Sequence, residues 1–362
     1  MGRKKRLLIL LFICIMILFG CARTRIIDKM SIAHVFGFDQ GGNGEIIGTA
    51  LFPEYTKSKD SDEIQSLEEH ALNPSLLISK MSTHTSTPVE IAKIRVILLG
   101  NSYAKAGIRD VVERLIVTPR LGTHIQIAAA TDSARKALNI FKKEKSLTLY
   151  ERIQQNIERQ NLPRMNLHIF LNHFYGEGMD AYVPMISIDK NDRLTVEGVG
   201  VFKDDKLKLH LNQDQTVLFS FIKDSRTQAT YKMELDGSHN RGEMIIVQAF
   251  QSKQNWDWDQ KEEELHCRIN LQMSLNQLPN RYNVEKKGEI AKIEKLVEMR
   301  IEKGLEELLN TLQRNEVDPI GIGNILRSKD KTWDKESFYK QYPDLPIHVD
   351  VNIKITHSGL EG

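Results

Sequence analysis

The chain is poor in cysteine, in net charge and in long apolar runs, and each shortage excludes a class of protein. It has 3 cysteines in 362 residues, too few for a disulfide-stabilised secreted scaffold. Its 50 Lys and Arg residues are balanced by 48 Asp and Glu residues, a net charge of +2 and not the basic excess of a nucleic-acid binder. A mean hydropathy of −0.36 excludes a polytopic membrane protein. We therefore expect a globular protein with no nucleic-acid partner.

Sequence motifs of metal, nucleotide and hydrolase chemistry are missing as well. The histidines form no HExxH motif, and there is no GxSxG elbow and no glycine-rich phosphate loop. His266 and Cys267 are neighbours on an expected strand, so their side chains point to opposite faces and cannot share a metal ion. The sequence predicts no catalytic residue, no metal site and no bound cofactor, and therefore a protein that is not an enzyme.

The N-terminus has the features of a signal peptide. The basic run Arg3-Lys4-Lys5-Arg6 precedes an uninterrupted apolar stretch over residues 7–19. At 1.5 Å per residue this stretch spans about 20 Å as a helix, whereas a membrane span needs about 20 apolar residues. We therefore predict that residues 1–20 are a cleaved signal peptide.

The segment Leu18-Phe19-Gly20-Cys21 resembles a bacterial lipobox. Cleavage after Gly20 would make Cys21 the first residue, carrying an S-diacylglycerol group and an N-palmitoyl group. Each buried CH₂ contributes about 0.8 kcal/mol to membrane binding, so these chains would hold the protein on a bilayer. We predict Cys21 as the lipid attachment site and membrane lipid as a partner. An uncleaved N-terminal anchor, with Cys21 incidental, is the alternative.

Residues 21–190 are expected to form an N-terminal α/β region of two subdomains. Strands are predicted at 30–38, 45–52, 94–100, 125–129 and 182–188, and helices at 76–81, 111–116, 134–141 and 150–161. Farther on, out-of-phase apolar alternation predicts a β-bulge at Glu197-Gly198, and Asn212 is expected to cap a helix.

Residues 191–362 are expected to form a C-terminal α+β domain. Three β-rich stretches at 228–235, 243–258 and 263–275 precede a helix at about 289–313 with apolar residues every three or four positions. A last strand alternates apolar and polar residues from Ile347 to Thr356. We therefore predict an α+β protein of two to three mixed subdomains, the C-terminal one an antiparallel sheet packed against the long helix.

Two short patterns allow a functional and a structural interpretation. Trp256 and Trp258 share one face of an expected strand. They could form a platform for a ligand or for a membrane, or they could be a half-buried pair packed against the long helix. We favour packing. Gly321-Ile322-Gly323 could bind phosphate, but we favour a tight turn that opens a helix.

The order of motifs resembles the Ger(x)C lipoproteins, the C subunits of bacterial spore nutrient germinant receptors. The residues that carry the resemblance are Leu18-Phe19-Gly20-Cys21, Gly37-Phe38-Asp39, Ala104-Lys105-Ala106-Gly107-Ile108, Thr118-Pro119-Arg120, Gly198-Val199-Gly200-Val201-Phe202-Lys203, Asp205-Lys206-Leu207, Asp318-Pro319-Ile320-Gly321-Ile322-Gly323, Trp333 and the last strand, ending near Gly359.

The resemblance implies a non-enzymatic receptor subunit that is needed for assembly or signalling in spore germination. It implies an α+β fold of three subdomains and a lipid anchor on the outer face of the spore inner membrane. Its partners would be the membrane-embedded A and B subunits of the receptor. The alternative is a solute-binding lipoprotein of a membrane transporter, and a lipid-anchored envelope enzyme is a third, less favoured class.

Overall fold

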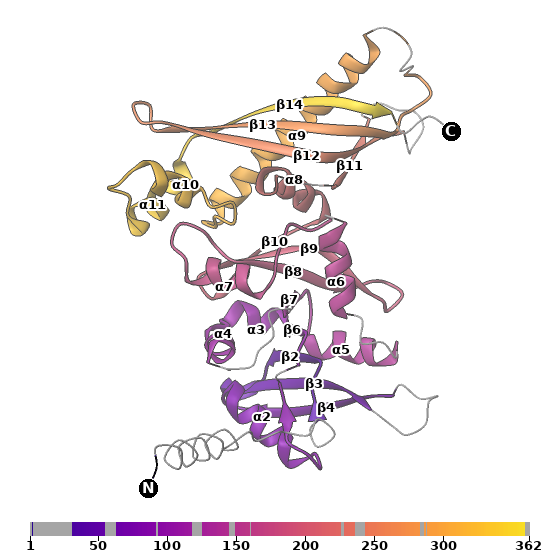
Figure 1. Ribbon diagram of the computed structural model, residues 1–362, viewed down its shortest axis with the longest axis vertical. Coiled ribbons are helices and arrows are strands. Elements are labelled where there is room, and N and C mark those ends of the chain that lie inside the picture. Colours follow the sequence, from indigo (N-terminus) through magenta and orange to yellow (C-terminus); the bar gives the residue numbers. More distant parts are fainter. Residues whose placement is uncertain are drawn as a thin grey trace.

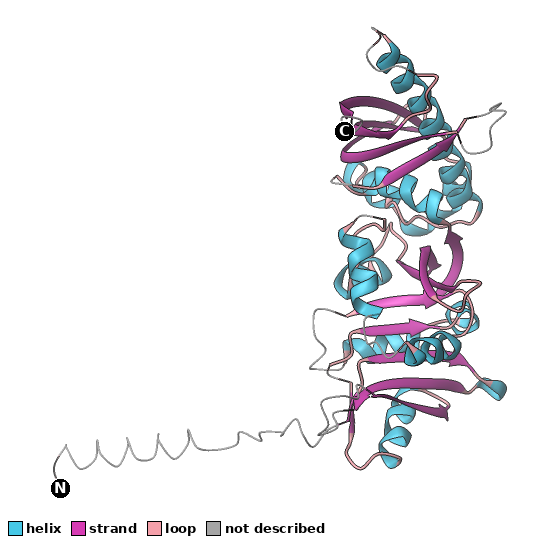
Figure 2. Ribbon diagram, turned by 90° about the vertical axis from the view of Figure 1, so that its right-hand side faces the viewer, coloured by secondary structure: helices cyan, strands magenta, loops and turns pink. Residues whose placement is uncertain are grey.

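The computed structural model shows an elongated molecule with the N-terminal strands at one end and a C-terminal sheet at the other (Figure 1). It describes residues 31–54, 63–91, 93–117, 125–144, 149–159, 161–225, 228–235, 243–282 and 288–358, and the single residues Gly2 and Lys286. Figures 1 and 2 both show the strands of two large sheets following one another along the long axis.

An eight-stranded mixed sheet forms the first part of the molecule. In spatial order its strands are β10 (Lys206–Leu211), β9 (Leu194–Lys203), β8 (Tyr182–Ile188), β7 (Gln126–Ala130), β6 (Val96–Leu99), β2 (Val35–Gln40), β3 (Ile46–Glu54) and β4 (Glu63–Ala71). The four central strands run parallel, and two antiparallel strands extend the sheet on each side. Two short parallel strands, β1 (Ser31–Ile32) and β5 (Val89–Glu90), pair separately.

Alternation along the strands divides the core of this sheet into two layers. In β6, Val96 and Leu98 face one hydrophobic cluster, while Ile97 and Leu99 face the other. Burial on both faces explains why the strand is a continuous apolar run. The flanking helices are α2 (Pro74–Thr83), α3 (Asn101–Ala106), α4 (Arg109–Ile116), α5 (Ala134–Lys143), α6 (Leu149–Glu158) and α7 (Leu167–Tyr175).

The predicted bulge and helix cap in the middle of the chain are both confirmed. Met185 lies opposite Gly198 but Ile186 lies opposite Val196, so Glu197 is the extra residue of the bulge. Asn212 caps α8 (Gln213–Lys223) through a reciprocal capping box with Gln215. β9 continues the sheet that β8 belongs to, across residue 190, and the domain limits at residues 190 and 191 stay a prediction.

The C-terminal part is a four-stranded sheet with a long helix, as predicted. Its strands, in spatial order, are β11 (Thr230–Glu234), β12 (Met244–Asp259), β13 (Glu264–Gln277) and β14 (Ile347–Ser358). The helices are α9 (Glu289–Arg314), α10 (Ile322–Lys329) and α11 (Lys335–Gln341), and 3-10 turns lie at Gly42–Gly44 and Tyr342–Asp344. The apolar face of α9 is buried from Ile293 to Leu312, whereas Ile290 is exposed.

The prediction of a purely antiparallel C-terminal sheet is wrong at its last strand. β14 pairs with β13 in parallel, with Leu265 opposite Ile347 and Ile269 opposite Val351. Between these strands the chain passes through α9, α10 and α11. This crossover returns it to the starting end of β13, as parallel pairing requires.

Candidate functional site

The predicted lipid attachment site, Cys21, lies outside the residues that the structure describes. The structure therefore leaves the signal peptide, the cleavage after Gly20 and the acylation of Cys21 as predictions. In the described part of the chain, no helix is both long and apolar enough to cross a bilayer. Among the same residues, no group of three or more His, Cys, Asp or Glu side chains is placed to hold a metal ion.

The glycine pair after Asp318 forms a tight turn that opens α10, as the favoured interpretation predicted. Gly321 has φ 91°, a left-handed conformation that favours glycine. The Asp318 carboxylate accepts the backbone N–H groups of Gly321 and Gly323, both at 2.8 Å. Because these donors are bonded to the protein's own carboxylate, this turn is not a free phosphate cradle.

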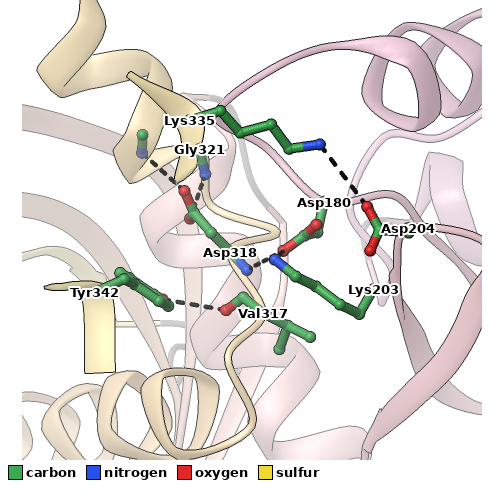
Figure 3. A network of polar contacts seen from close by, with 9 residues as sticks. Asp180, Lys203, Asp204, Val317, Asp318, Gly321, Lys335 and Tyr342 are labelled. Atoms are coloured by element: carbon green, nitrogen blue, oxygen red, sulfur yellow. Dashed lines mark hydrogen bonds and ion pairs between the residues drawn. The ribbon is translucent and has the colours of Figure 1, made fainter. Parts of the chain in front are cut away.

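Asp318 and Asp180 join the C-terminal part of the chain to the eight-stranded sheet. The N–H of Asp318 donates to the Asp180 carboxylate at 2.7 Å, and the N–H of Asp180 donates to the carbonyl oxygen of Asp318 at 2.8 Å. Asp180 lies two residues before β8, and Asp318 lies between α9 and α10. Figure 3 shows the two chain segments meeting at these residues.

Two lysines complete this contact, which we call the polar joint (Asp180, Lys203, Lys223 and Asp318). The Lys203 ammonium lies 3.4 Å from the Asp180 carboxylate and 2.9 Å from the ring centroid of Tyr339 in α11. The Lys223 ammonium at the end of α8 donates to the carbonyl oxygens of Pro319 and Ile320, at 3.1 and 3.0 Å. The turn after Asp318 is therefore bonded to α8 and to the segment that leads into β8, and Lys203 of the same sheet also contacts α11.

Burial sets the ionisation of the polar joint. Asp318 is fully buried, which raises the pKa of its carboxyl to about 6 although backbone N–H bonds favour the charged form. Burial lowers the pKa of Lys223 to about 8, against the attraction of Asp318 and Asp224. Burial also raises the pKa of Asp180, and the nearby Lys203 cation opposes that rise. The side chains with shifted pKa values are thus bonded to backbone groups of the protein itself.

The two tryptophans of β12 are half-buried, as the favoured interpretation predicted, but the neighbours of Trp258 described below belong to α10 and α11 and not to the long helix. Both are partly buried against the main hydrophobic cluster. Trp258 also lines a cavity of about 190 Å³ together with Leu326, Trp333 and Phe338 of the α10–α11 segment. The neighbours of Trp258 at this cavity therefore belong to α10 and α11. The alternation along the strand does not indicate this contact, because it joins distant parts of the chain.

His266 and Cys267 point to opposite faces of β13, as expected. Cys267 is fully buried, and burial raises the pKa of its thiol to about 12. His266 is exposed and stacks on His348 of β14, with 5.0 Å between the ring centroids. The buried thiol is therefore part of the core and is not a nucleophile.

A wide groove runs beside α9 and has a volume of about 680 Å³. Its walls come from α8, β11, β12 and α9, and they carry charges of both signs: Asp214, Lys232, Glu234, Arg300, Lys303 and Glu307. Sequence reasoning missed this groove, because its walls come from elements that are separated along the chain. A mixed-charge surface of this kind suits a polar partner better than an apolar ligand.

The comparisons with known proteins agree with this geometry. Residues 23–188 match the family "Spore germination protein N-terminal domain", and residues 197–359 match "Spore germination B3/ GerAC like, C-terminal". The chain belongs to the Ger(x)C family. This member is 26% identical to the spore germination protein GerQC of Bacillus cereus over 97% of this chain and 98% of that protein.

The fold also matches a crystal structure of the GerBC protein. The TM-score is 0.59 at 15% sequence identity, and the match covers 88% of this chain and 96% of that chain. At this identity the likeness concerns the fold alone, and it confirms the mixed α+β class. The Ger(x)C membership rests on the two family matches, which together extend over almost the whole chain.

Proposed function

We propose that this Ger(x)C protein acts in spore germination as the lipid-anchored, non-enzymatic C subunit of a nutrient germinant receptor. The observation that carries the proposal is the pair of family matches, one over residues 23–188 and one over residues 197–359. Both halves of the chain are of the spore germination type, so the role belongs to the protein as a whole. The matches do not favour the alternative of a solute-binding lipoprotein of a transporter.

The anchor in this proposal is Cys21. Its support is the sequence: a basic run, a short apolar stretch and a lipobox-like segment that ends at Gly20-Cys21. An S-diacylglycerol and an N-palmitoyl group on Cys21 would hold the protein at the outer face of the spore inner membrane. There it would meet the A and B membrane subunits of the receptor.

The non-enzymatic role is supported by the bonds of the perturbed titratable groups. Catalytic acids and bases have shifted pKa values but remain open to a substrate. Asp318, by contrast, is fully buried and accepts two backbone N–H groups, and Lys223 donates to two carbonyl oxygens. Burial in the fold thus accounts for both pKa shifts, and the bonds of both groups are to the protein's own backbone. We infer that the protein acts through its contacts with other subunits.

The test is the nutrient response of spores that lack this gene. Dipicolinate release is measured across a panel of amino acids, sugars and nucleosides, with a cationic surfactant as a trigger that bypasses receptors. We expect one nutrient response to be lost, the surfactant response to stay intact, and the wild-type gene to restore the loss. An unchanged response over the whole panel, in spores without a second gene of this family, would contradict the proposal.

The anchor is tested separately with a Cys21→Ala variant. We expect this protein to leave the membrane fraction of spore lysates and to restore the nutrient response poorly. A Cys267→Ala variant is the matched control, since Cys267 is buried in β13 of the C-terminal sheet. Full membrane retention of Cys21→Ala would favour the uncleaved N-terminal anchor instead.

A further inference from the structure

An apolar cleft lies between α2 and α4 at the N-terminal end of the molecule. Its walls are almost wholly apolar: Phe36, Phe38, Pro74, Ile78, Ile91, Ile94, Ile97, Val111 and Leu115, with Arg114 as the single charged residue. The cavity itself is only about 20 Å³, close to the size of one water molecule. The cavity is therefore too small to hold a ligand, so a contact with a partner would involve the surface around it.

The rim of this cleft exposes aliphatic side chains. Leu72 and Leu76, at the start of α2, are 66% and 45% exposed. Ile116 and Val117, at the end of α4, are 51% and 64% exposed. These are four of the eight large apolar side chains that the described residues expose, and all four flank the same two helices. Single exposed apolar residues are ordinary, but four of them at the ends of the two helices that wall one apolar cleft indicate a contact surface.

The described chain begins beside this cleft. Ser31 pairs with Val89, and the N–H of Ala33 donates to the carbonyl oxygen of Glu90 at 3.2 Å. The next residues of that segment, Ile91 and Ile94, line the cleft. Cys21 and Ser31 are ten positions apart in the sequence, which is at most about 35 Å of extended chain. If Cys21 carries acyl chains, their attachment point lies within that distance of Ser31.

We propose that the Leu72, Leu76, Ile116 and Val117 surface rests in the outer leaflet of the membrane that the lipid anchors. This inference depends on the proposed acylation of Cys21. The occupant is the bilayer because of the tether length and because the four exposed apolar side chains are all aliphatic. Protein contacts are usually anchored by aromatic and Arg side chains, with Leu and Val under-represented. The sheet of β11–β14, at the other end of the long axis, then lies away from the bilayer (Figure 1).

The test uses the full acylated chain in vesicles of phosphatidylethanolamine and phosphatidylglycerol. Single variants Leu72→Cys, Leu76→Cys and Val117→Cys are labelled with bimane. Met299→Cys is the matched control, since Met299 is 60% exposed and lies in α9, near the other end of the molecule. The native Cys267 is buried, so labelling reports the introduced thiol. We expect brominated lipids to quench the three rim probes at least threefold more than the Met299 probe, with iodide showing the reverse order.

The possible results separate the two proposals. If the protein fails to float with the vesicles, the anchor at Cys21 is wrong. If it floats but iodide quenches the rim probes as strongly as the Met299 probe, the membrane contact is wrong and the anchor stands. Rim probes that are shielded from both quenchers would show that protein covers the surface, which also overturns the bilayer as the occupant.

Discussion

The N–H of Ile353 in β14 donates a hydrogen bond to the carboxylate of Glu298 in α9, at 3.1 Å. Its neighbours repeat the arrangement: the N–H of Ile355 bonds Glu294 at 2.8 Å, and the N–H of Val351 bonds Glu302 at 3.3 Å. Carboxylates four residues apart on a helix rise about 6 Å, and alternate strand residues are about 6.6 Å apart, so the two series stay in register. We call Glu294, Glu298 and Glu302 the glutamate ladder.

The glutamate ladder occupies the outer edge of β14, the last strand of the C-terminal sheet. An open edge would offer unpaired N–H groups to a strand of another chain. We predict that replacing all three glutamates with alanine lowers the free energy of unfolding by about 2–4 kcal/mol, at about 1 kcal/mol per lost bond. The variant should also self-associate as its concentration rises. Urea unfolding and sedimentation velocity measure both effects.

The control for this prediction is Glu306→Ala, on the same helix. Glu306 is exposed and takes part in none of the three carboxylate bonds to β14. The free energy of unfolding of Glu306→Ala should stay within about 0.5 kcal/mol of the wild-type value, as for ordinary surface substitutions. A triple variant that is no less stable than Glu306→Ala would show that the ladder bonds are not stabilising.

The pH dependence of stability should carry the signature of Asp318. Its folded pKa is raised to about 6, above the value of about 3.9 in an unfolded chain, so the folded protein binds the proton more tightly. The contribution of this carboxyl to the free energy of unfolding is therefore largest below about pH 4 and is lost as the pH rises from about 4 to 6. In Asp318→Asn this fall in stability should be absent. Urea unfolding of both proteins from pH 4 to 7 gives the difference curve.

Other carboxyl groups titrate in the same range, so the difference between the two proteins is the quantity to compare. Asp180 accepts the N–H of Asp318, and the negative charge of Asp180 adds to the rise in the pKa of Asp318 that burial causes. Asp344→Asn, a change outside the polar joint, serves as the control. Parallel curves for wild type and Asp318→Asn would contradict the raised pKa.

Much of the fold could be predicted because its signals are local. The Asn212 cap, the Glu197-Gly198 bulge and the alternation along β14 each depend on a few neighbouring residues. The predicted helix at about 289–313 corresponds to α9 because its apolar residues recur every three or four positions. α7 was missed because its bulky sequence, LHIFLNHFY, does not show a clean apolar face, although Asn166 supplies an N-cap signal.

The polar joint and the glutamate ladder could not be predicted, because both depend on contacts between distant residues. Asp180 and Asp318 are 138 positions apart, and neither neighbourhood indicates the other. Glu298 and Glu302 lie between the apolar residues of the long helix, so the helical pattern alone indicates no partner for them. They bind β14 only because that strand returns in parallel, at the edge of the sheet beside α9.

Gly323 should tolerate no side chain. A Cβ there would lie 2.7 Å from the Cα of Gly178 and 2.8 Å from the ring of Phe338, which is closer than carbon atoms approach. We predict that Gly323→Ala lowers the free energy of unfolding by about 1–3 kcal/mol, as overpacking does. Gly42→Ala is the control, since a Cβ at Gly42 has nothing within 4 Å. Thermal unfolding of the two variants checks the contrast, and equal melting temperatures would refute it.

Asp180 and Lys203 should be energetically coupled. Their charged groups are 3.4 Å apart, and the side chains are only 8% and 24% exposed. Removing one partner leaves the other charge in a poorly solvated site, so Asp180→Asn and Lys203→Met should each destabilise the protein by about 2–4 kcal/mol. The double variant should lose about 1–3 kcal/mol less than the sum of the single losses.

The control is an exposed ion pair, Lys136 and Asp132, whose charged groups are 2.8 Å apart. The same double-mutant cycle on this pair should give a coupling energy of less than about 1 kcal/mol. Additive losses at Asp180 and Lys203 would mean that each side chain acts through its other contacts, with Tyr339 the first to examine.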